Sequence, residues 1–394
     1  MFPTFAVKSD HHFMKILFYL GTIGIILFEI ANVYFIMPMP GSQRIHSIDL
    51  AFCLYQLRWV FRGVFSVMIF LGLLPAFRVS PWISGVLLAF AIVVAYLFNF
   101  EMAAEKMFHQ PYNLRMADAK TNAVKSEKLV MGVELNGQAK AYPIQFMGYH
   151  HQVLDTVGGT PVMVTYCTVC RTGRVFSPTV NGKPEQFRLV GMDHFNAMFE
   201  DATTHSWWRQ ATGEAVAGPL KGSALPEIPF TQSTLQEWLD LFPNSLVMQR
   251  DPSFQEEYDS MDTYDLGFGR GKLTRSDTAS WNEKSWVVGI ATDKQNAKAF
   301  DWNRLKTERI IQDQVGNQPM VVALALDNAS FVAYKRANAT DVFTFQNDTL
   351  SMGEKRWDLL GRAVNHADGN LTKIPAYQEF WHSWRTFHPY TTRY

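Results

Sequence analysis

The chain has 394 residues with 36 basic and 36 acidic side chains, so its formal net charge is zero. Only 18 % of the residues are charged, which argues against a nucleic-acid partner. Three cysteines are too few for a disulfide-rich scaffold.

Three long apolar segments in the first hundred residues predict a helical membrane anchor over residues 1–105. They run from Ile16 to Met37, from Leu57 to Leu74 and from Trp82 to Phe98, each long enough to span a bilayer. The lipid bilayer is therefore the first expected partner, with a redox or membrane-protein partner as a second. Glu29 interrupts the first segment. A carboxylate there is costly unless it is paired, so we predict an ion pair with Arg62 on the second span.

The rest of the chain has short apolar runs separated by Gly, Pro and Asn, which predict a mainly β soluble region. We divide it into a polar stalk (106–128), a first β-rich half (129–250), a linker (251–285) and a second β-rich half (286–394). Asn136-Gly137, between LVMGVEL and QAKAYPI, predicts a hairpin. The stretch LQEWLDLF, at residues 235–242, predicts a short helix.

The two β-rich halves look like repeats of one another. Ala139-Lys140-Ala141-Tyr142 corresponds to Ala297-Lys298-Ala299-Phe300, and Asp155 corresponds to Asp313 at the same offset. Features that both halves share are best explained by a common fold, whereas features of one half alone point to chemistry.

The feature that only the first half carries is a Cys-x-x-Cys motif. A strand is expected at Pro161–Tyr166, and Cys167-Thr168-Val169-Cys170 follows it directly, so the turn brings both sulfurs to one side. The corresponding positions of the second half hold Ala325 and Asn328. Two thiols in a turn suit either a metal ion or a reversible disulfide.

We predict a metal site that adds His150 to Cys167 and Cys170, with His194 or Met198 completing it. Thiolate, imidazole and thioether ligands together favour copper over zinc as the cofactor. Two alternatives stay open: a redox-active dithiol, and a non-catalytic binding or assembly module held by a structural disulfide. No recognisable motif identifies catalytic residues, so whether the protein is an enzyme is left open.

The strings AYPIQFMGYHHQVLDTVGGTPVMVTYCTVCRTG and WWRQATGEAVAGPLKG resemble the bacterial domain-of-unknown-function 3179 family. The resemblance covers about residue 130 to the C-terminus. The family pattern at the thiols is roughly Tyr-Cys-Pro-Leu-Cys-Gly-Thr-Gly, of which this chain keeps both cysteines, and the family's His-Glu pair appears here as His150-His151. The resemblance implies a bacterial inner-membrane protein with an extracytoplasmic soluble region, although the distribution of Lys and Arg does not favour that orientation.

Overall fold

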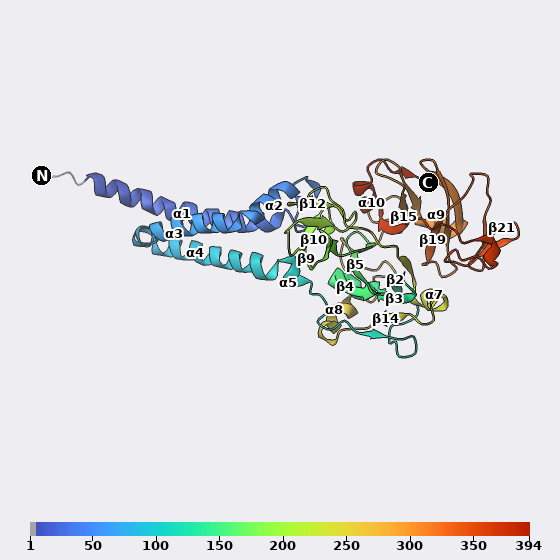
Figure 1. Ribbon diagram of the computed structural model, residues 1–394. Helices are drawn as coiled ribbons and strands as arrows, with labels where there is room; N and C mark the ends of the chain where they lie inside the picture. The colour runs from blue at the N-terminus through green and yellow to red at the C-terminus, as the bar shows by residue number, and fades with distance from the viewer. Residues whose placement is uncertain (1–4) are drawn as a thin grey trace.

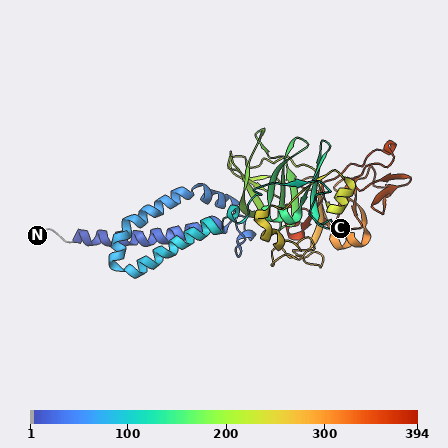
Figure 2. The ribbon, with the colours of Figure 1, turned by 90° about the horizontal axis from the view of Figure 1, so that it is seen from below.

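The structure, a computed structural model, describes residues 5–394; residues 1–4 of the predicted anchor lie outside the described part. A bundle of long helices projects from a β-rich body (Figures 1 and 2). The predicted combination of a three-helix anchor and a mainly β soluble region is confirmed.

The anchor contains three helices that are long and apolar enough to cross a membrane, at His12–Tyr34, Arg58–Val79 and Pro81–Glu101. They belong to α1 (Phe5–Tyr34), α3 (Arg58–Val79) and α4 (Pro81–Tyr96), and α4 continues as the π-helix η2 (Leu97–Glu101). Between α1 and α3 lie the turn η1 (Ser42–Arg44) and the helix α2 (Ile48–Gln56). Pro81 separates α3 from α4, because a residue before proline disfavours helix while proline itself suits a first helical position.

Glu29 forms the predicted ion pair inside the bundle. Its two carboxylate oxygens accept hydrogen bonds from Arg62 at 2.7 and 2.8 Å. Asn99, from η2, donates to Glu29 and accepts from Arg62, so three helices share one polar cluster. The prediction that Glu29 faces Arg62 rather than lipid is confirmed.

The first half of the soluble region folds around a sheet of order β1-β14-β3-β2-β13 and a three-stranded sheet β4-β5-β6. The predicted Asn-Gly hairpin and the predicted short helix are both present, as β2–β3 and α7. The elements are β1 (Met116–Ala117), β2 (Leu129–Leu135), β3 (Gln138–Pro143), α6 (Ile144–His150), β4 (Gln152–Val157), β5 (Thr160–Cys167), β6 (Thr172–Phe176), β7 (Thr179–Val180), β8 (Lys183–Pro184), β9 (Phe187–Asp193), β10 (Asn196–Asp201), β11 (Trp207–Arg209), β12 (Ala215–Ala217), β13 (Thr231–Thr234), α7 (Leu235–Leu241) and β14 (Leu246–Met248).

The second half contains a sheet of order β23-β15-β16-β24 and a three-stranded sheet β17-β18-β19. A linker that contains the 3₁₀-helix η3 (Pro252–Phe254) and the helix α8 (Gln255–Ser260) precedes it. The elements are β15 (Trp286–Ala291), β16 (Ala297–Asp301), α9 (Trp302–Glu308), β17 (Ile310–Val315), β18 (Gln318–Leu324), β19 (Phe331–Lys335), β20 (Thr344–Gln346), β21 (Thr349–Met352), β22 (Lys355–Trp357), η4 (His366–Asp368), β23 (Tyr377–Phe380), α10 (Trp381–Phe387) and β24 (Thr392–Arg393).

The two halves share the order of four strands, β14-β3-β2-β13 in the first and β24-β16-β15-β23 in the second, and several side-chain contacts. Lys140 binds Asp155 at 2.9 Å in the first half, and Lys298 binds Asp313 at 2.6 Å in the second. Trp238 packs on Gly132, as Trp384 packs on Gly289, where a side chain would collide with the indole ring. These correspondences are those expected of the predicted repeat. That the halves superpose as one fold stays a prediction.

The soluble region rests directly on the anchor. The amide of Met192, in β9, donates to the carbonyl of Ile36 at 2.6 Å, and Gly191 allows this close approach because a Cβ there would lie 2.3 Å from the same oxygen. The segment predicted as a stalk also packs on the body: it contains α5 (Ala104–Met107) at its start and contributes β1, which pairs with β14. The membrane-facing end and the β-rich body are therefore in direct contact.

Candidate functional site

The Cys-x-x-Cys motif lies at the tip of a buried β-hairpin. Cys167 is the last residue of β5, and β6 begins two residues after Cys170. Arg171 between them adopts a positive φ of 53°, which closes the turn. Both cysteines are free thiols and fully buried. The expected position of the two thiols, at the end of the strand, is confirmed.

A second hairpin covers the two sulfurs. His194 and Phe195 form the two-residue turn between β9 and β10, with φ values of 49° and 68°. The carbonyl oxygen of Phe195 accepts from both thiols, at 3.5 Å from Cys167 Sγ and 3.3 Å from Cys170 Sγ. Turns of this kind ordinarily use Asn and Gly, so two bulky residues with positive φ store strain at this point.

Two side chains from beyond the first half contact the thiol turn. Lys284, in the linker, donates to the carbonyl of Val169 at 2.6 Å. His382, in α10, has its Nε2 atom 3.1 Å from that carbonyl and 3.1 Å from Lys284 Nζ. The Nε2 atom cannot donate to Val169 and accept from Lys284 at once, so the imidazole tautomer decides which contact is a hydrogen bond. Lys284 and His382 thus form a titratable pair beside the thiols.

The two thiols differ in acidity. Burial raises the pKa of Cys167, but hydrogen bonds from Cys170 and from backbone amides outweigh burial and bring that pKa below its ordinary value. Burial raises the pKa of Cys170, and its contact with Cys167 raises it further. Burial also lowers the pKa of His382 to about 3, so this imidazole is neutral near pH 7. A thiolate would therefore form at Cys167 rather than at Cys170.

A cavity of about 550 Å³ adjoins this group, and Phe195, Lys284 and His382 line it. We call it the thiol pocket. Its other lining residues come from the anchor, the β9–β10 turn, the linker and α10: Gln43, Arg44, His194, Lys272, Leu273, Glu283, Arg385 and Thr386. Four of the lining side chains are lysine or arginine and one is acidic, so the pocket favours anions.

The anchor supports the strained turn. Gln43 is buried, and its Oε1 atom accepts from the amide of Phe195 at 3.0 Å, while its Nε2 atom donates to carbonyls of the anchor. The ring of His46 lies 4.7 Å from that of His194. The position of the Phe195 carbonyl, and with it the contact to both thiols, depends on the segment that follows the first membrane helix.

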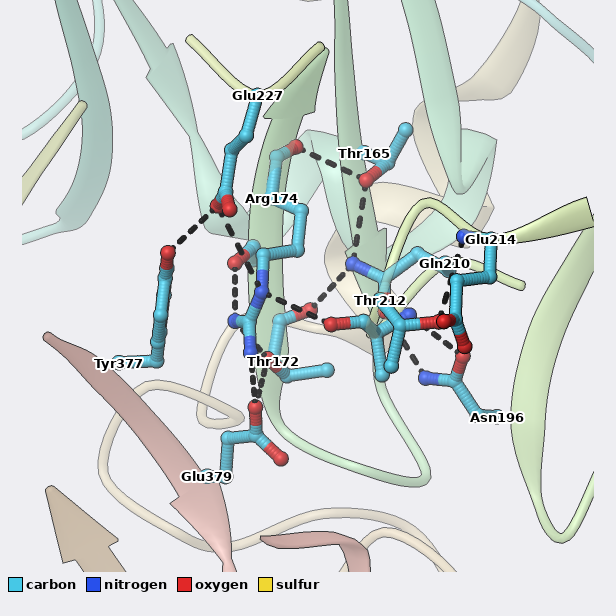
Figure 3. A network of polar contacts seen from close by, with 12 residues as sticks. Thr165, Thr172, Arg174, Asn196, Gln210, Thr212, Glu214, Glu227, Tyr377 and Glu379 are labelled. Atoms are coloured by element: carbon cyan, nitrogen blue, oxygen red, sulfur yellow. Dashed lines mark hydrogen bonds and ion pairs between the residues drawn. The ribbon is translucent and has the colours of Figure 1, made fainter. Parts of the chain in front are cut away.

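A buried polar network fixes β6, directly after the thiol turn, to the second half (Figure 3). Arg174 binds Glu379 of β23 at 2.5 Å, and Thr172 donates to the same carboxylate at 2.8 Å. Arg171 donates to Gln378 and to the carbonyls of Tyr264 and Asp265. The amide of Phe380 donates to the carbonyl of Cys170 at 2.9 Å. The thiol turn is therefore clamped by the strand that leads into α10.

The predicted histidine ligand lies in a separate environment. Both ring nitrogens of His150 have partners: Nδ1 lies 2.5 Å from the carbonyl oxygen of His109, and Nε2 lies 2.6 Å from the hydroxyl of Tyr258. His151 contacts the carbonyl of Tyr149 and the ring of Phe108. The β4 strand does fold back beside β5, as expected, but the imidazole of His150 packs among aromatic rings instead of turning to the sulfurs.

The remaining predicted ligands do not join the cysteines either. His194 bonds to Asp193 at 2.5 Å and lines the thiol pocket. Met198 packs in a core cluster with Ile36 and Trp207, whereas the cysteines belong to a different cluster. Across the described residues, no group of three or more His, Cys, Asp or Glu side chains is arranged to hold a metal ion. The structure brings together the two thiols of the predicted ligand set and none of the other three residues.

Sequence reasoning missed Phe195, Lys284 and His382. The sequence favoured His150 as a ligand because it lies near the motif, whereas His382 lies more than two hundred positions away. The one local signal was the pair His194-Phe195 between two β-rich stretches, where a hairpin turn would require unusual backbone angles.

Comparison with known proteins gives a family without an assigned activity. The sequence model of a family described as protein of unknown function (DUF3179) matches residues 110–391. No curated protein and no solved structure matches the chain.

Proposed function

The chain belongs to the DUF3179 family, and we propose that it is a membrane-anchored thiol-redox protein whose working group is the Cys167–Cys170 dithiol. The observation that carries the proposal is the pair of free sulfurs that converge on the Phe195 carbonyl under a strained turn. Strain and buried titratable groups concentrate at functional sites. Phe195, Lys284 and His382 contact the thiol turn and also line a cationic pocket, so a reactant held there lies next to the two buried sulfurs.

The reaction proposed is thiol–disulfide exchange with a disulfide-containing reactant. The Cys167 thiolate attacks one sulfur of that disulfide, forming a mixed disulfide, and the other sulfur leaves with the bonding electron pair. Cys170 then loses its proton and attacks Cys167 Sγ, which forms the Cys167–Cys170 disulfide and releases the second thiolate. Two electrons pass from the dithiol to the reactant, which becomes two thiols.

Lys284 and His382 assist this exchange reaction. The ammonium group of Lys284 favours negative charge on either sulfur, which lowers the cost of forming a thiolate in a buried site. The neutral His382 imidazole contacts both the Lys284 ammonium group and the Val169 carbonyl, so it helps to hold Lys284 beside the thiol turn. Both residues also line the thiol pocket, so a reactant in the cavity meets the ammonium group at one wall.

A trapping experiment tests the proposal. The full chain is purified in detergent with Cys53→Ser, because Cys53 is an exposed cysteine of α2 that would react as background. The reduced protein is treated with the anionic disulfide dithiobis(nitrobenzoate), and the products are identified by intact mass. With both site cysteines present we expect an internal disulfide and two released thiolates for each protein. Cys170→Ser should stop at a stable mixed disulfide on Cys167, and Cys167→Ser should react much more slowly.

Two results would reject the redox proposal. One is a dithiol that stays reduced with excess reagent while Cys53 in the parent chain reacts. The other is equal trapping in Cys167→Ser and Cys170→Ser, which would remove the assignment of separate attacking and resolving thiols. His205, exposed on a loop, is the matched control: His205→Gln should leave the trapping rate unchanged, and His382→Gln should slow the second step.

A second candidate function is binding of copper(I) by the two thiolates. Soft thiolate ligands select copper(I), and the presence of two thiols without a third convergent ligand suits a two-coordinate ion better than tetrahedral zinc. The test is copper(I) titration of the reduced, Cys53→Ser chain against a competing chelator. One ion per chain, lost in both Cys167→Ser and Cys170→Ser and retained in His150→Gln, would support this candidate over the four-ligand site.

We also propose that the soluble region lies on the extracytoplasmic side of a bacterial inner membrane, where disulfide-containing reactants persist. The family resemblance supports this side. A C-terminal alkaline phosphatase fusion tests it, because that enzyme is active only after export. An inactive fusion, with an active cytoplasmic reporter at the same position, would place the thiols in the cytoplasm.

A further inference from the structure

A second polar cavity lies where the anchor meets the β-rich body, and the thiol chemistry does not use it. Its volume is about 300 Å³, and it is lined from both sides: by α1, α2, α3 and η2 of the anchor and by β9 of the body. We call it the junction pocket. Its polar lining includes Asn32, Arg58, Arg62, Asn99 and Arg188.

Exposed aromatic residues place the junction pocket at the level of the membrane surface. Trp59, next to Arg58 on α3, is 70 % exposed, and Tyr96, at the end of α4, is 54 % exposed. Trp and Tyr gather where the apolar core of a membrane meets the headgroups. The same level is marked by η2, where α4 changes to a π-helix, a feature often found at functional sites.

Most charges around the junction pocket are already compensated. Arg62 is bound to Glu29 and Asn99, as described above. Arg188 contacts Glu200 at 2.9 Å and Glu105 at 3.2 Å, and it donates to the Tyr55 hydroxyl. These arginines therefore offer little attraction to a further anion.

Arg58 is different. It lies over the Tyr55 ring at 3.8 Å and donates one hydrogen bond, from Nη1 to the Tyr55 carbonyl at 2.6 Å. It forms no ion pair with any residue of the described chain. An arginine fixed in this way presents its remaining N–H groups as a fork that suits a phosphate.

Asn32 supplies an independent sign of a missing ligand. This residue of α1 is only 8 % exposed, and its Oδ1 atom is buried without a hydrogen-bond partner in the described structure. Buried polar atoms are ordinarily paired, so an orphan acceptor facing a cavity calls for a donor from outside the chain. The junction pocket is therefore suited to a ligand with one anionic group and one hydrogen-bond donor.

From these contacts we infer that the junction pocket binds the headgroup of an anionic glycerophospholipid that carries a hydroxyl, of which phosphatidylglycerol is the simplest. The phosphodiester binds Arg58, and a headgroup hydroxyl donates to Asn32 Oδ1. The acyl chains extend along the exposed apolar faces of α3, α4 and η2, which include Trp59, Val60, Val93 and Phe100. The proposed lipid contacts are separate from the proposed redox group, because neither Arg58 nor Asn32 forms a hydrogen bond with the thiols or with their turn.

The experiment measures lipid binding to the full chain in detergent micelles by native mass spectrometry and by thermal unfolding. The probes are phosphatidylglycerol, phosphatidylmethanol, which keeps the charge but lacks hydroxyls, and zwitterionic phosphatidylcholine. We expect the affinities to fall in that order, with phosphatidylglycerol bound about tenfold more tightly than phosphatidylcholine, as one charge-assisted contact would give. Glycerol 3-phosphate, added alone, tests whether a free phosphate suffices.

Variants assign the preference to residues. Arg58→Gln should bind phosphatidylglycerol no better than phosphatidylcholine, and Arg58→Lys should recover part of the preference. Asn32→Leu keeps the branching and the number of heavy atoms of the side chain but removes its acceptor, so it should bind phosphatidylglycerol and phosphatidylmethanol equally. Arg78→Gln, at the other end of α3, is the matched control and should behave as the parent chain does.

The inference fails if the parent chain does not discriminate among the three lipids, or if Arg58→Gln and Arg78→Gln lose the same amount of binding. Saturation by glycerol 3-phosphate at a concentration that matches the lipid would also overturn it, because the source would then be a soluble anion. If Arg58→Gln does not fold, the comparison of Asn32→Leu with the parent chain decides.

Discussion

The cationic lining of the thiol pocket should make the dithiol selective for anionic reactants. The perturbation is the double substitution Arg44→Gln with Lys272→Gln, two exposed residues of the lining that form no ion pair within the described chain. Neither residue contacts the cysteines through a hydrogen bond, so the change removes charge and leaves the thiol turn in place.

The size of the pocket sets the interaction energy between the lining charges and an anionic reagent. A cavity of about 550 Å³ has an equivalent radius of about 5 Å, at which two unit charges interact by about 0.8 kcal/mol in water. Two lost charges then cost an anionic reagent about 1.7 kcal/mol before screening. The Debye length of about 8 Å at 0.15 M salt reduces this to about 0.9 kcal/mol, or about fivefold in rate, and at 0.01 M salt the effect is about tenfold.

The assay compares second-order rates of reduced Cys53→Ser protein with three disulfides: anionic dithiobis(nitrobenzoate), neutral dithiodipyridine and cationic cystamine. The double variant should slow the first, leave the second unchanged and speed the third. The control is Lys335→Gln with Lys355→Gln, which removes the same net charge from exposed positions of the second half. Equal losses in the two double variants, or a loss that does not depend on salt, would refute the role of the pocket charges.

Three further outcomes test the scaffold. Glu379→Gln should lower the free energy of unfolding by about 3–5 kcal/mol, because it leaves Arg174 buried without its charged partner. The melting temperature should fall by about 2–4 °C for each kcal/mol lost. A loss under about 1 kcal/mol would show that Glu379 is dispensable. Glu29→Gln should destabilise the detergent-solubilised anchor by about 2.5–3.5 kcal/mol, and adding Arg62→Gln should restore most of the loss, whereas equal stability of Glu29→Gln and the parent would contradict the pairing. Burial lowers the pKa of His151 to about 4, so between about pH 6.5 and 4 the unfolded state binds a proton that the folded state excludes. The free energy of unfolding therefore decreases as the pH is lowered through this range, by up to about 1.4 kcal/mol per pH unit. Urea unfolding of His151→Asn from pH 7 to 4 should show a slope shallower by that amount, and an unchanged slope would show that His151 does not contribute.

Local patterns predicted the fold well. The apolar lengths predicted three helices, Asn136-Gly137 predicted its hairpin, and the strand before Cys167 ends where its composition indicates. Each of these depends on neighbours along the chain. The ion pair of Glu29 was also predictable, because the anchor holds few polar groups that could compensate a buried carboxylate.

The candidate site was predicted only in part, because some of its residues lie far from the cysteines along the chain. Cys167 and Cys170 share a turn, so their proximity follows from the motif. Phe195 reaches them through a hairpin turn whose one signal in the sequence is the His194-Phe195 pair between two β-rich stretches, and His382 arrives with a helix of the other half. The metal prediction relied on His150 because it was close in sequence, yet the left-handed conformation of His151, which ends α6, directs the neighbouring imidazole toward Tyr258.

The way in which the halves meet explains why a single CxxC turn requires both. The strand β23 and the start of α10 cap the first-half turn, where the Phe380 amide donates to Cys170. Near the second-half turn, the start of α7 makes a different contact, in which the Thr234 amide donates to the hydroxyl of Ser330 at 3.0 Å. Each half therefore contacts the turn of the other.

The two turns differ in the side chains that they hold. The first-half turn holds two thiols and is contacted by His382, whereas the second-half turn holds Ala325 and Asn328. Neither half alone would contain dithiol and imidazole together. The thiol turn is closed only when both halves are present, because the second half provides the helix α10 that contacts it.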